Sequence, residues 1–300
     1  MTLFYSDVYV LPLPSHHRFP MGKYSRLRER LLASGEFAPD DFRVPDGATD
    51  GDITRVHCPD YLERVATGRL DAAEIRAIGF PWSERMVERS RRSSGATLAA
   101  AREALTRGWS ANLAGGTHHA FRDRGEGFCV FNDAAIAARA MQAEAGLQRV
   151  AIIDCDVHQG NGTASIFAGD ESVFTFSIHG ARNFPFAKEA SDLDIDLPDG
   201  TGDDEYLWHL ERGLDEALER SRPQLAFYLA GADPYEDDRL GRLKLTKAGL
   251  ARRDELVLGT LAARAIPVAL AMAGGYARDI ADSVEIHAAT ICTAHRRCGA

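Results

Sequence analysis

Two short apolar segments of the chain are followed directly by side chains that can bind a metal ion. The run 150–153 is followed by Asp156 and His158, and the run 225–231 is followed by Asp233. Because side chains two positions apart in an extended segment point to the same side, Asp156 and His158 can reach one ion. Asp233 would complete a set of two carboxylates and one imidazole, which leaves a coordination position open for water and substrate, as in catalytic metal sites.

The types of these ligands favour some metals over others. Two carboxylates and an imidazole form a harder ligand set than the thiolates of zinc fingers, so we expect Zn²⁺ first, with Fe²⁺ or Mn²⁺ as alternatives. In isolation, such a pattern more often means that Asp156 and His158 form a hydrogen-bonded cap and that Asp233 begins a turn with Pro234. The metal hypothesis therefore depends on the other reactive groups of the chain.

A pair of adjacent histidines, His118 and His119, follows two glycines. A buried imidazole pair needs partners that fix tautomer and charge, and Asp154 and Asn161 are the candidates. An aspartate raises the pKa of a neighbouring imidazole more than an amide does. One histidine can therefore remain a neutral base while its neighbour carries charge.

Tyr276 follows Gly274 and Gly275 at the end of another apolar run. The glycines allow close approach of the backbone, and the tyrosine hydroxyl could donate to a carbonyl oxygen that a metal polarises. By itself this tripeptide is typical of a turn with a core tyrosine. A metal, a base and this donor together are the parts of a hydrolytic amidase.

The elements that must position these residues alternate along the chain. Short apolar runs are separated by longer helical patterns at 82–108, 205–221 and 247–265, an arrangement that predicts one doubly wound, mostly parallel α/β sheet flanked by helices. We expect a single domain over 1–300. Ligands of such sheets bind at the carboxyl ends of the strands, which would bring distant segments into one site. The predicted strands are 111–116, 150–153, 173–178, 225–231 and 268–273.

Two segments rich in Asp, Pro and Gly, near 36–54 and 189–204, are predicted to be loops. The histidine pair 16–17 lies in a proline-rich segment, and we expect no catalytic role for it.

Composition excludes several other classes of protein. A formal net charge of −9 would repel nucleic acid and is mildly compatible with a cationic substrate, and no apolar run approaches the roughly 18 residues of a membrane span. The amino terminus lacks the features of a signal peptide, and the five cysteines are odd in number and scattered, without a CxxC pair. We therefore expect a cytoplasmic protein with free thiols that binds neither nucleic acid nor membranes.

Taken together, the motifs resemble those of the histone deacetylase family. GGTHHAF, GFCVFND, DCDVHQGNGT, FSIH, AGADPYEDDRLGRLKLT and AGGY occur in the order of that family, and HRFPMGKYSRL and RVHCPDYL extend the likeness to nearly the whole chain. The short loops resemble class IV and its bacterial relatives. The resemblance implies an arginase/deacetylase-like fold and a zinc-dependent hydrolase.

The resemblance also implies a role for each reactive residue. It makes Asp156, His158 and Asp233 the zinc ligands. His119 becomes the general base and acid, and His118 becomes its electrostatic partner.

Further roles follow from the same likeness. Tyr276 becomes the oxyanion donor, Asp154 supports His118, and Asn161 supports His119. Asn161 stands in place of an aspartate of class I members, which alters the basicity of His119.

Two additional sites are implied. Asp154 with Ser177 would help to hold a monovalent cation, such as a structural K⁺. An acyl-lysine channel would be lined by Gly127, Phe128, Phe184 and Leu240, whose alternative role is core packing.

The sequence leaves several functions open. The same groups would serve deacylation of acetyl-lysine or longer acyl-lysine in peptides, or deacetylation of polyamines and other small amides. An arginase-like ureohydrolase and a non-catalytic acyl-lysine binding module are the more distant alternatives. Acyl-chain length, the native metal and oligomeric state are not determined by these motifs.

Overall fold

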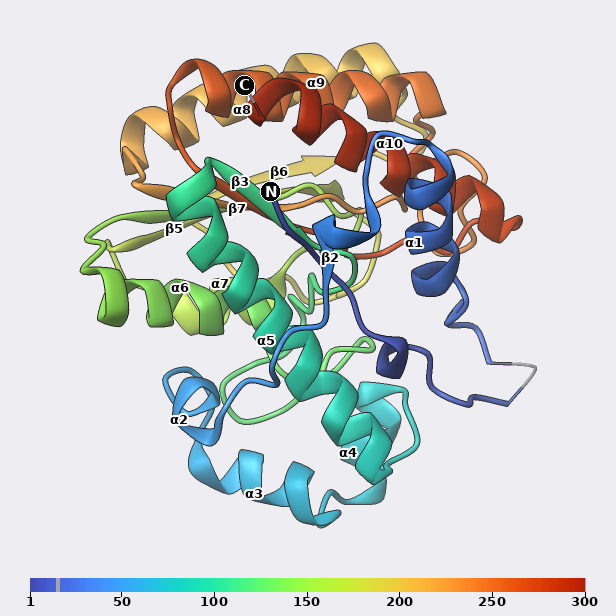
Figure 1. Ribbon diagram of the computed structural model, residues 1–300, viewed down its shortest axis with the longest axis vertical. Helices are drawn as coiled ribbons and strands as arrows, with labels where there is room; N and C mark the ends of the chain where they lie inside the picture. The colour runs from blue at the N-terminus through green and yellow to red at the C-terminus, as the bar shows by residue number, and fades with distance from the viewer. Residues whose placement is uncertain (15–16, 300) are drawn as a thin grey trace.

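Eight parallel strands form one open sheet in the computed structural model, which describes residues 1–14 and 17–299 (Figure 1). Their order across the sheet is β2-β1-β3-β8-β7-β4-β5-β6, and each pairing between these strands is parallel. The doubly wound parallel sheet predicted from the sequence is therefore confirmed. The strands are Leu3–Phe4 (β1), Phe42–Arg43 (β2), Trp109–Asn112 (β3), Val150–Asp154 (β4), Val173–Gly180 (β5), Leu193–Leu197 (β6), Leu225–Leu229 (β7) and Val268–Ala271 (β8).

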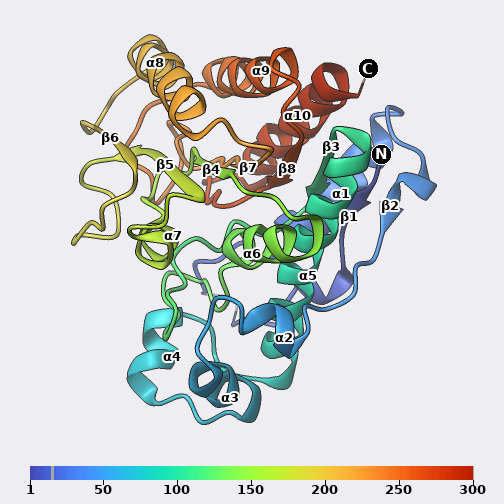
Figure 2. The ribbon, with the colours of Figure 1, turned by 90° about the vertical axis from the view of Figure 1, so that its left-hand side faces the viewer.

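Helices cover both faces of the sheet (Figures 1 and 2). One face carries α1 (Lys23–Ala33), α8 (Asp203–Ser221), α9 (Lys247–Ala263) and α10 (Ile280–Cys298), and the other carries α5 (Glu84–Arg107), α6 (Asp133–Ala145) and α7 (Asn161–Phe167). Three further helices lie beyond the edge of the sheet, at the bottom of Figure 1. They are α2 (Asp50–Ile53), α3 (Pro59–Thr67) and α4 (Ala72–Ile78), and two 3-10 turns span Asp7–Tyr9 and Pro39–Asp41.

Strands β7 and β8 are apolar throughout, and β4 is apolar up to its last residue, because each of their faces packs against a helical layer. In β7, Leu225, Phe227 and Leu229 belong to the core on the α5 and α6 side, whereas Ala226 and Tyr228 belong to the core under α8, α9 and α10. Strands buried on both faces read as continuous apolar runs. This is why β4, β5, β7 and β8 were predictable from the sequence. The strand predicted at 111–116 is correct only in part, because β3 ends at Asn112 and the rest of that range lies in the turn after it.

The two predicted loops are wrong in part. The segment 189–204 contains β6, whose Leu193 to Leu197 pair in register with Phe176 to Gly180 of β5. The sequence of β6 is LDIDL, so apolar and acidic residues alternate as expected of an edge strand with one wet face, and the acidic half concealed the strand. The segment 36–54 likewise contains β2 and α2.

Parallel pairing places the carboxyl ends of all the strands at one edge of the sheet. The turns that follow β3, β4, β5, β7 and β8 therefore meet there. In the part of the chain that the structure describes, none of the helices combines the length and apolar character needed to cross a membrane.

Candidate active site

The three predicted metal ligands come together at the carboxyl edge of the sheet. Asp156 and His158 lie in the turn after β4, and Asp233 follows the neighbouring strand β7. One ligand atom from each residue lies within 4.8 Å of the others, and all three residues are buried. The backbone of Val157 donates to Asp233 Oδ1 at 3.0 Å and thereby links the two turns.

The surroundings of Asp233 fit a bound cation. Its Oδ2 is buried and accepts no hydrogen bond from the described residues, although it lies 3.3 Å from His158 Nδ1. Burial, and next the neighbouring carboxylate of Asp156, raise the pKa of Asp233 to about 6. Crowding two buried carboxylates is costly without a positive charge between them, and a divalent ion supplies that charge.

The backbone at Gly274 is fitted to the same cluster. Gly274 N donates to Asp156 Oδ2 at 2.7 Å. A Cβ atom at this position would collide with the carboxylates of Asp233 and Asp156, so a side chain is excluded there. The glycine seen in the sequence before Tyr276 therefore lets the backbone approach the metal ligands.

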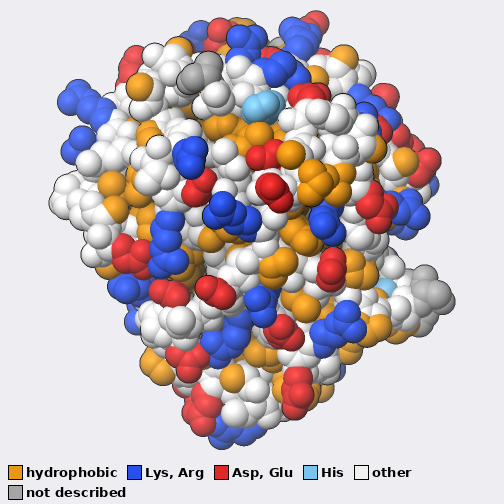
Figure 3. Space-filling view, viewed as in Figure 1, with side chains coloured by type: hydrophobic (Ala, Val, Ile, Leu, Met, Phe, Trp, Pro, Cys, Tyr) orange, Lys and Arg blue, Asp and Glu red, His pale blue; other side chains and the backbone are white. Residues whose placement is uncertain are grey.

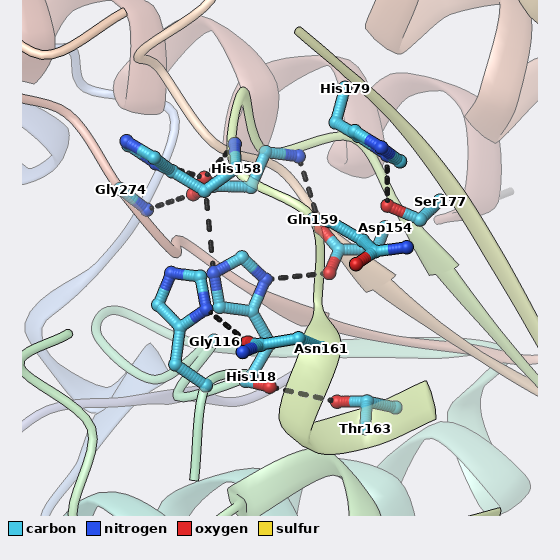
Figure 4. A network of polar contacts seen from close by, with 12 residues as sticks. Gly116, His118, Asp154, His158, Gln159, Asn161, Thr163, Ser177, His179 and Gly274 are labelled. Carbon is cyan, nitrogen blue, oxygen red and sulfur yellow. Dashed lines mark hydrogen bonds and ion pairs between the residues drawn. The ribbon is translucent and has the colours of Figure 1, made fainter. Parts of the chain in front are cut away.

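The histidine pair lies beside this cluster, and each ring has the partner expected from the sequence. Figure 4 shows His118 beside Asp154. His118 Nδ1 is 2.6 Å from Asp154 Oδ2, and His119 Nδ1 is 2.7 Å from Asn161 Oδ1. The centroids of the two rings are 4.1 Å apart. The pair is thus buried, closely packed and asymmetric in its partners.

This asymmetry separates the charges of the two rings. Burial opposes charge on His118, but the carboxylates of Asp154 and Asp156 outweigh it and raise the pKa of His118 to about 9. Burial, and next the positive charge of His118, hold the pKa of His119 well below its usual range. At neutral pH His118 is therefore charged and His119 is neutral.

Asn161 fixes the tautomer of His119. Its Nδ2 donates to Glu126 Oε1 at 2.6 Å, so its carbonyl oxygen faces the ring. His119 must then donate from Nδ1, and Nε2 carries the lone pair. A neutral histidine with a free Nε2 can accept a proton.

Tyr276 lines the same cavity as the histidine pair. Its ring lies 6.4 Å from that of His158, and its backbone N donates to Asp238 Oδ2 at 2.6 Å. Burial, and next the charges of Asp233 and Asp156, raise the pKa of Tyr276 well above its usual value. The phenol stays protonated and remains a hydrogen-bond donor.

A cavity of about 760 Å³ connects these groups to the surface. All four residues predicted for the channel line it: Gly127, Phe128, Phe184 and Leu240. Gly127 has φ of 57°, and a Cβ there would come within 2.6 Å of the His119 ring. The Phe184 ring lies 4.9 Å from the His119 ring, so the channel reaches the base.

The residues predicted to hold a monovalent cation are neighbours. Asp154 and Ser177 are register partners on β4 and β5. Ser177 Oγ lies 2.9 Å from His179 Nδ1, and Asp154 Oδ1 accepts from Asp156 N at 3.0 Å. The cation itself stays a prediction.

The sequence did not identify two buried residues that hydrogen-bond to the backbone of the turns carrying the site residues. Lys23 is 2% exposed, and its Nζ donates to the carbonyl of Ala273, next to the glycine pair, at 3.0 Å. Asp133 accepts from the backbone N of Gly116 at 3.0 Å and of Thr117 at 2.8 Å, which fixes the turn before the histidines. The only signal in the sequence was that Lys23 and Asp133 lie in motifs that resemble the family, HRFPMGKYSRL and GFCVFND. These motifs do not indicate which groups the two side chains contact.

Of the second histidine pair, His17 does not line the cavity. His17 stacks on Phe80, and its Nε2 lies 2.9 Å from the carbonyl oxygen of Gly79. His16 lies outside the described residues.

The sequence of the chain is similar to those of known proteins. A family model described as the histone deacetylase domain matches residues 17–291. Histone deacetylase 2 of Arabidopsis thaliana is 32% identical over 292 residues, which covers 93% of this chain and 76% of that protein.

Solved structures share the fold. A histone deacetylase homologue from Aquifex aeolicus superposes with a TM-score of 0.82 at 22% identity, over 99% of this chain and 84% of that one. Acetylpolyamine aminohydrolase from Burkholderia pseudomallei gives a TM-score of 0.79 at 23% identity, over 98% of each chain.

Proposed function

The chain belongs to the histone deacetylase family, and from this premise we propose that it removes the acyl group from acylated lysine side chains. Family membership identifies the protein as a hydrolase. One observation carries the proposal: two residues of the metal-ligand cluster, Asp156 and His158, line the same channel as the histidine pair and Tyr276. The single catalytic domain over 1–300 and the class IV-like character expected from the sequence are part of this proposal.

Asp156, His158 and Asp233 would hold the ion, with Zn²⁺ proposed and Fe²⁺ or Mn²⁺ as alternatives. When bound, the metal polarises the amide carbonyl and lowers the pKa of a water molecule from about 15.7 toward about 7. Asp154 and Ser177 are proposed to help hold a K⁺ ion close to the site, since they face one another on adjacent strands.

The chain's own residues then move the protons. His119 accepts a proton from water at Nε2 and delivers it to the departing lysine amine. The charged ring of His118 stabilises negative charge nearby, and the hydroxyl of Tyr276 donates to the carbonyl oxygen as it becomes an oxyanion.

Substituting the partner of His119 should change the pH dependence of this reaction. Asn161→Asp is expected to shift the acid limb of the kcat/KM profile to higher pH by about one unit, because a carboxylate at Nδ1 favours the protonated ring. As the pH falls, the base is then lost earlier than in the wild type. The measurement is kcat/KM for one acyl-lysine peptide between pH 5 and 9.

Glu126 provides the control for that experiment. Its carboxylate lies 2.6 Å from Asn161 Nδ2, so it would share a proton with the new carboxylate and blunt the shift. The double variant Asn161→Asp/Glu126→Gln restores a donor and should show the larger shift. An acid limb unchanged in the double variant would contradict the role of His119 as base.

The function is tested with a panel of substrates. The protein is loaded with Zn²⁺, Fe²⁺ or Mn²⁺ and assayed with lysine peptides carrying acyl groups from acetyl to myristoyl, with acetylated polyamines, and with guanidino compounds. Metal-dependent turnover of acyl-lysine supports the proposal and identifies the acyl class. Turnover of acetylpolyamines alone would instead favour the activity named for the Burkholderia structure, urea release would favour a ureohydrolase, and binding without turnover would favour a non-catalytic module.

A further inference from the structure

The residues that line the channel differ in charge from the rest of the chain. Acidic residues outnumber lysine and arginine in the whole sequence by 44 to 35. Among the 30 described residues that line the cavity, six are arginines, and the one acidic residue is Asp156 in the metal-ligand cluster. The cavity is therefore basic within an acidic protein.

Five of these arginines are exposed, as expected for residues at the mouth of the channel. They come from four separate segments, namely the loop before α1, helix α4, the loop between β5 and β6, and the loop after β7. We call them the mouth arginines: Arg18, Arg76, Arg182, Arg239 and Arg242.

Most of the mouth arginines lack a carboxylate partner. Arg242 lies 3.1 Å from Asp199, and Arg239 donates from Nε to the carbonyl of Tyr276 at 3.1 Å. Arg18, Arg76 and Arg182 form no ion pair or side-chain hydrogen bond with any other described residue. On the face drawn in Figure 3, basic and acidic side chains are interspersed.

Unpaired positive charges around one opening raise the local concentration of anions there. We infer that the protein selects acylated lysines flanked by acidic residues in a peptide, a substrate class that rests on the deacylase function proposed above. The acyl-lysine would enter the channel, and the flanking carboxylates would meet Arg18, Arg76 and Arg182 outside it. Phe186, which is 86% exposed and also lines the cavity, offers an apolar surface for the peptide beside them.

Two other occupants fit less well. A polyamine is cationic and would be repelled at this opening. Nucleic acid would meet the mouth arginines but also the net charge of −9 on the rest of the chain.

The experiment compares matched peptides and matched variants. Three peptides carry the same acyl-lysine and differ only in flanking residues, which are Glu, Gln or Lys. The mouth variant combines Arg18→Ser, Arg76→Ser and Arg182→Ser. Its control removes the same charge from exposed arginines that do not line the cavity, with Arg26→Ser, Arg43→Ser and Arg212→Ser.

We expect the wild type to prefer the Glu peptide over the Lys peptide by about tenfold in kcat/KM, through KM rather than kcat, with a preference that shrinks as NaCl is raised. The control variant should keep the preference, and the mouth variant should lose most of it. Equal kcat/KM for all three peptides, a preference for Lys flanks, or a preference that survives in the mouth variant would overturn the inference.

A measurement of peptide binding tests this inference independently of the proposed hydrolysis. Anisotropy of the same peptides, fluorescently labelled, reports affinity even if no peptide is hydrolysed. Tighter binding of the Glu peptide that depends on the mouth arginines upholds the inference although the reaction fails. Stronger binding of a single-stranded oligonucleotide than of the Glu peptide, lost in the mouth variant, would assign the arginines to nucleic acid instead.

Discussion

Tyr276→Phe is expected to lower kcat by a factor on the order of 10² to 10³, about 3 to 4 kcal/mol of transition-state stabilisation, while metal binding persists. The substitution removes one hydroxyl from a buried ring whose backbone is held by Asp238 and Arg239. The fold and the channel should therefore remain. Steady-state kinetics on an acyl-lysine peptide, together with metal content, provide the measurement.

A second buried tyrosine serves as the control for this loss. The hydroxyl of Tyr61 donates to the carbonyl of Val130 at 2.8 Å, and Tyr61 does not line the channel. Tyr61→Phe removes a hydroxyl and should cost about 1 kcal/mol of unfolding free energy with kcat retained. Wild-type-like kcat in Tyr276→Phe would refute the oxyanion role, and an equal loss in both variants would point to general damage.

The convergence of the site was predictable because it follows from local patterns. Asp156 and His158 stand two apart at the end of an apolar run, and parallel strands end at one edge of the sheet. From these facts alone Asp233 was expected beside them. The structure brings the ligand atoms within 4.8 Å of one another.

Contacts between distant segments were not predictable in the same way. Lys23 reaches Ala273 across 250 positions of sequence, and no local pattern of α1 marks its Nζ as buried. Asp238 accepts from the backbone of Leu240, Gly241 and Tyr276, so it joins two turns that the sequence shows separately. Such residues are identified only once the chain is folded.

The net charge of the chain does not predict the charge at the channel mouth. The net charge of −9 is mildly compatible with a cationic substrate, yet the channel mouth carries unpaired arginines from separate segments. Net charge describes the sum over the whole surface, whereas a ligand at the channel responds to the groups near it. The local arrangement therefore decides the preference expected for the substrate.

Removing a metal ligand should abolish activity while revealing what the cation does for stability. Asp233→Asn keeps the size of the side chain and an acceptor for Val157 N, but it removes a negative charge from the ligand set. We expect loss of bound metal and a fall in kcat of at least about 10³, because the Lewis acid and the activated water are lost together. Metal analysis and kinetics measure both, and Asp204→Asn on exposed α8 is the charge-matched control.

Thermal unfolding distinguishes loss of a metal ligand from general loss of structure, because the two cases predict different effects of metal on Tm. Metal stabilises the wild type by mass action, so its Tm should rise on adding Zn²⁺ and that of Asp233→Asn should not. Without metal, the Tm of the wild type should be equal to or lower than that of Asp233→Asn. The reason is that the wild type then holds two buried carboxylates side by side, those of Asp233 and Asp156, and the Oδ2 of Asp233 accepts no hydrogen bond from the described residues. A variant that unfolds at lower temperature than the chelated wild type would show that Asp233 stabilises the fold by itself. That result would contradict the assignment of Asp233 as a ligand of a bound cation.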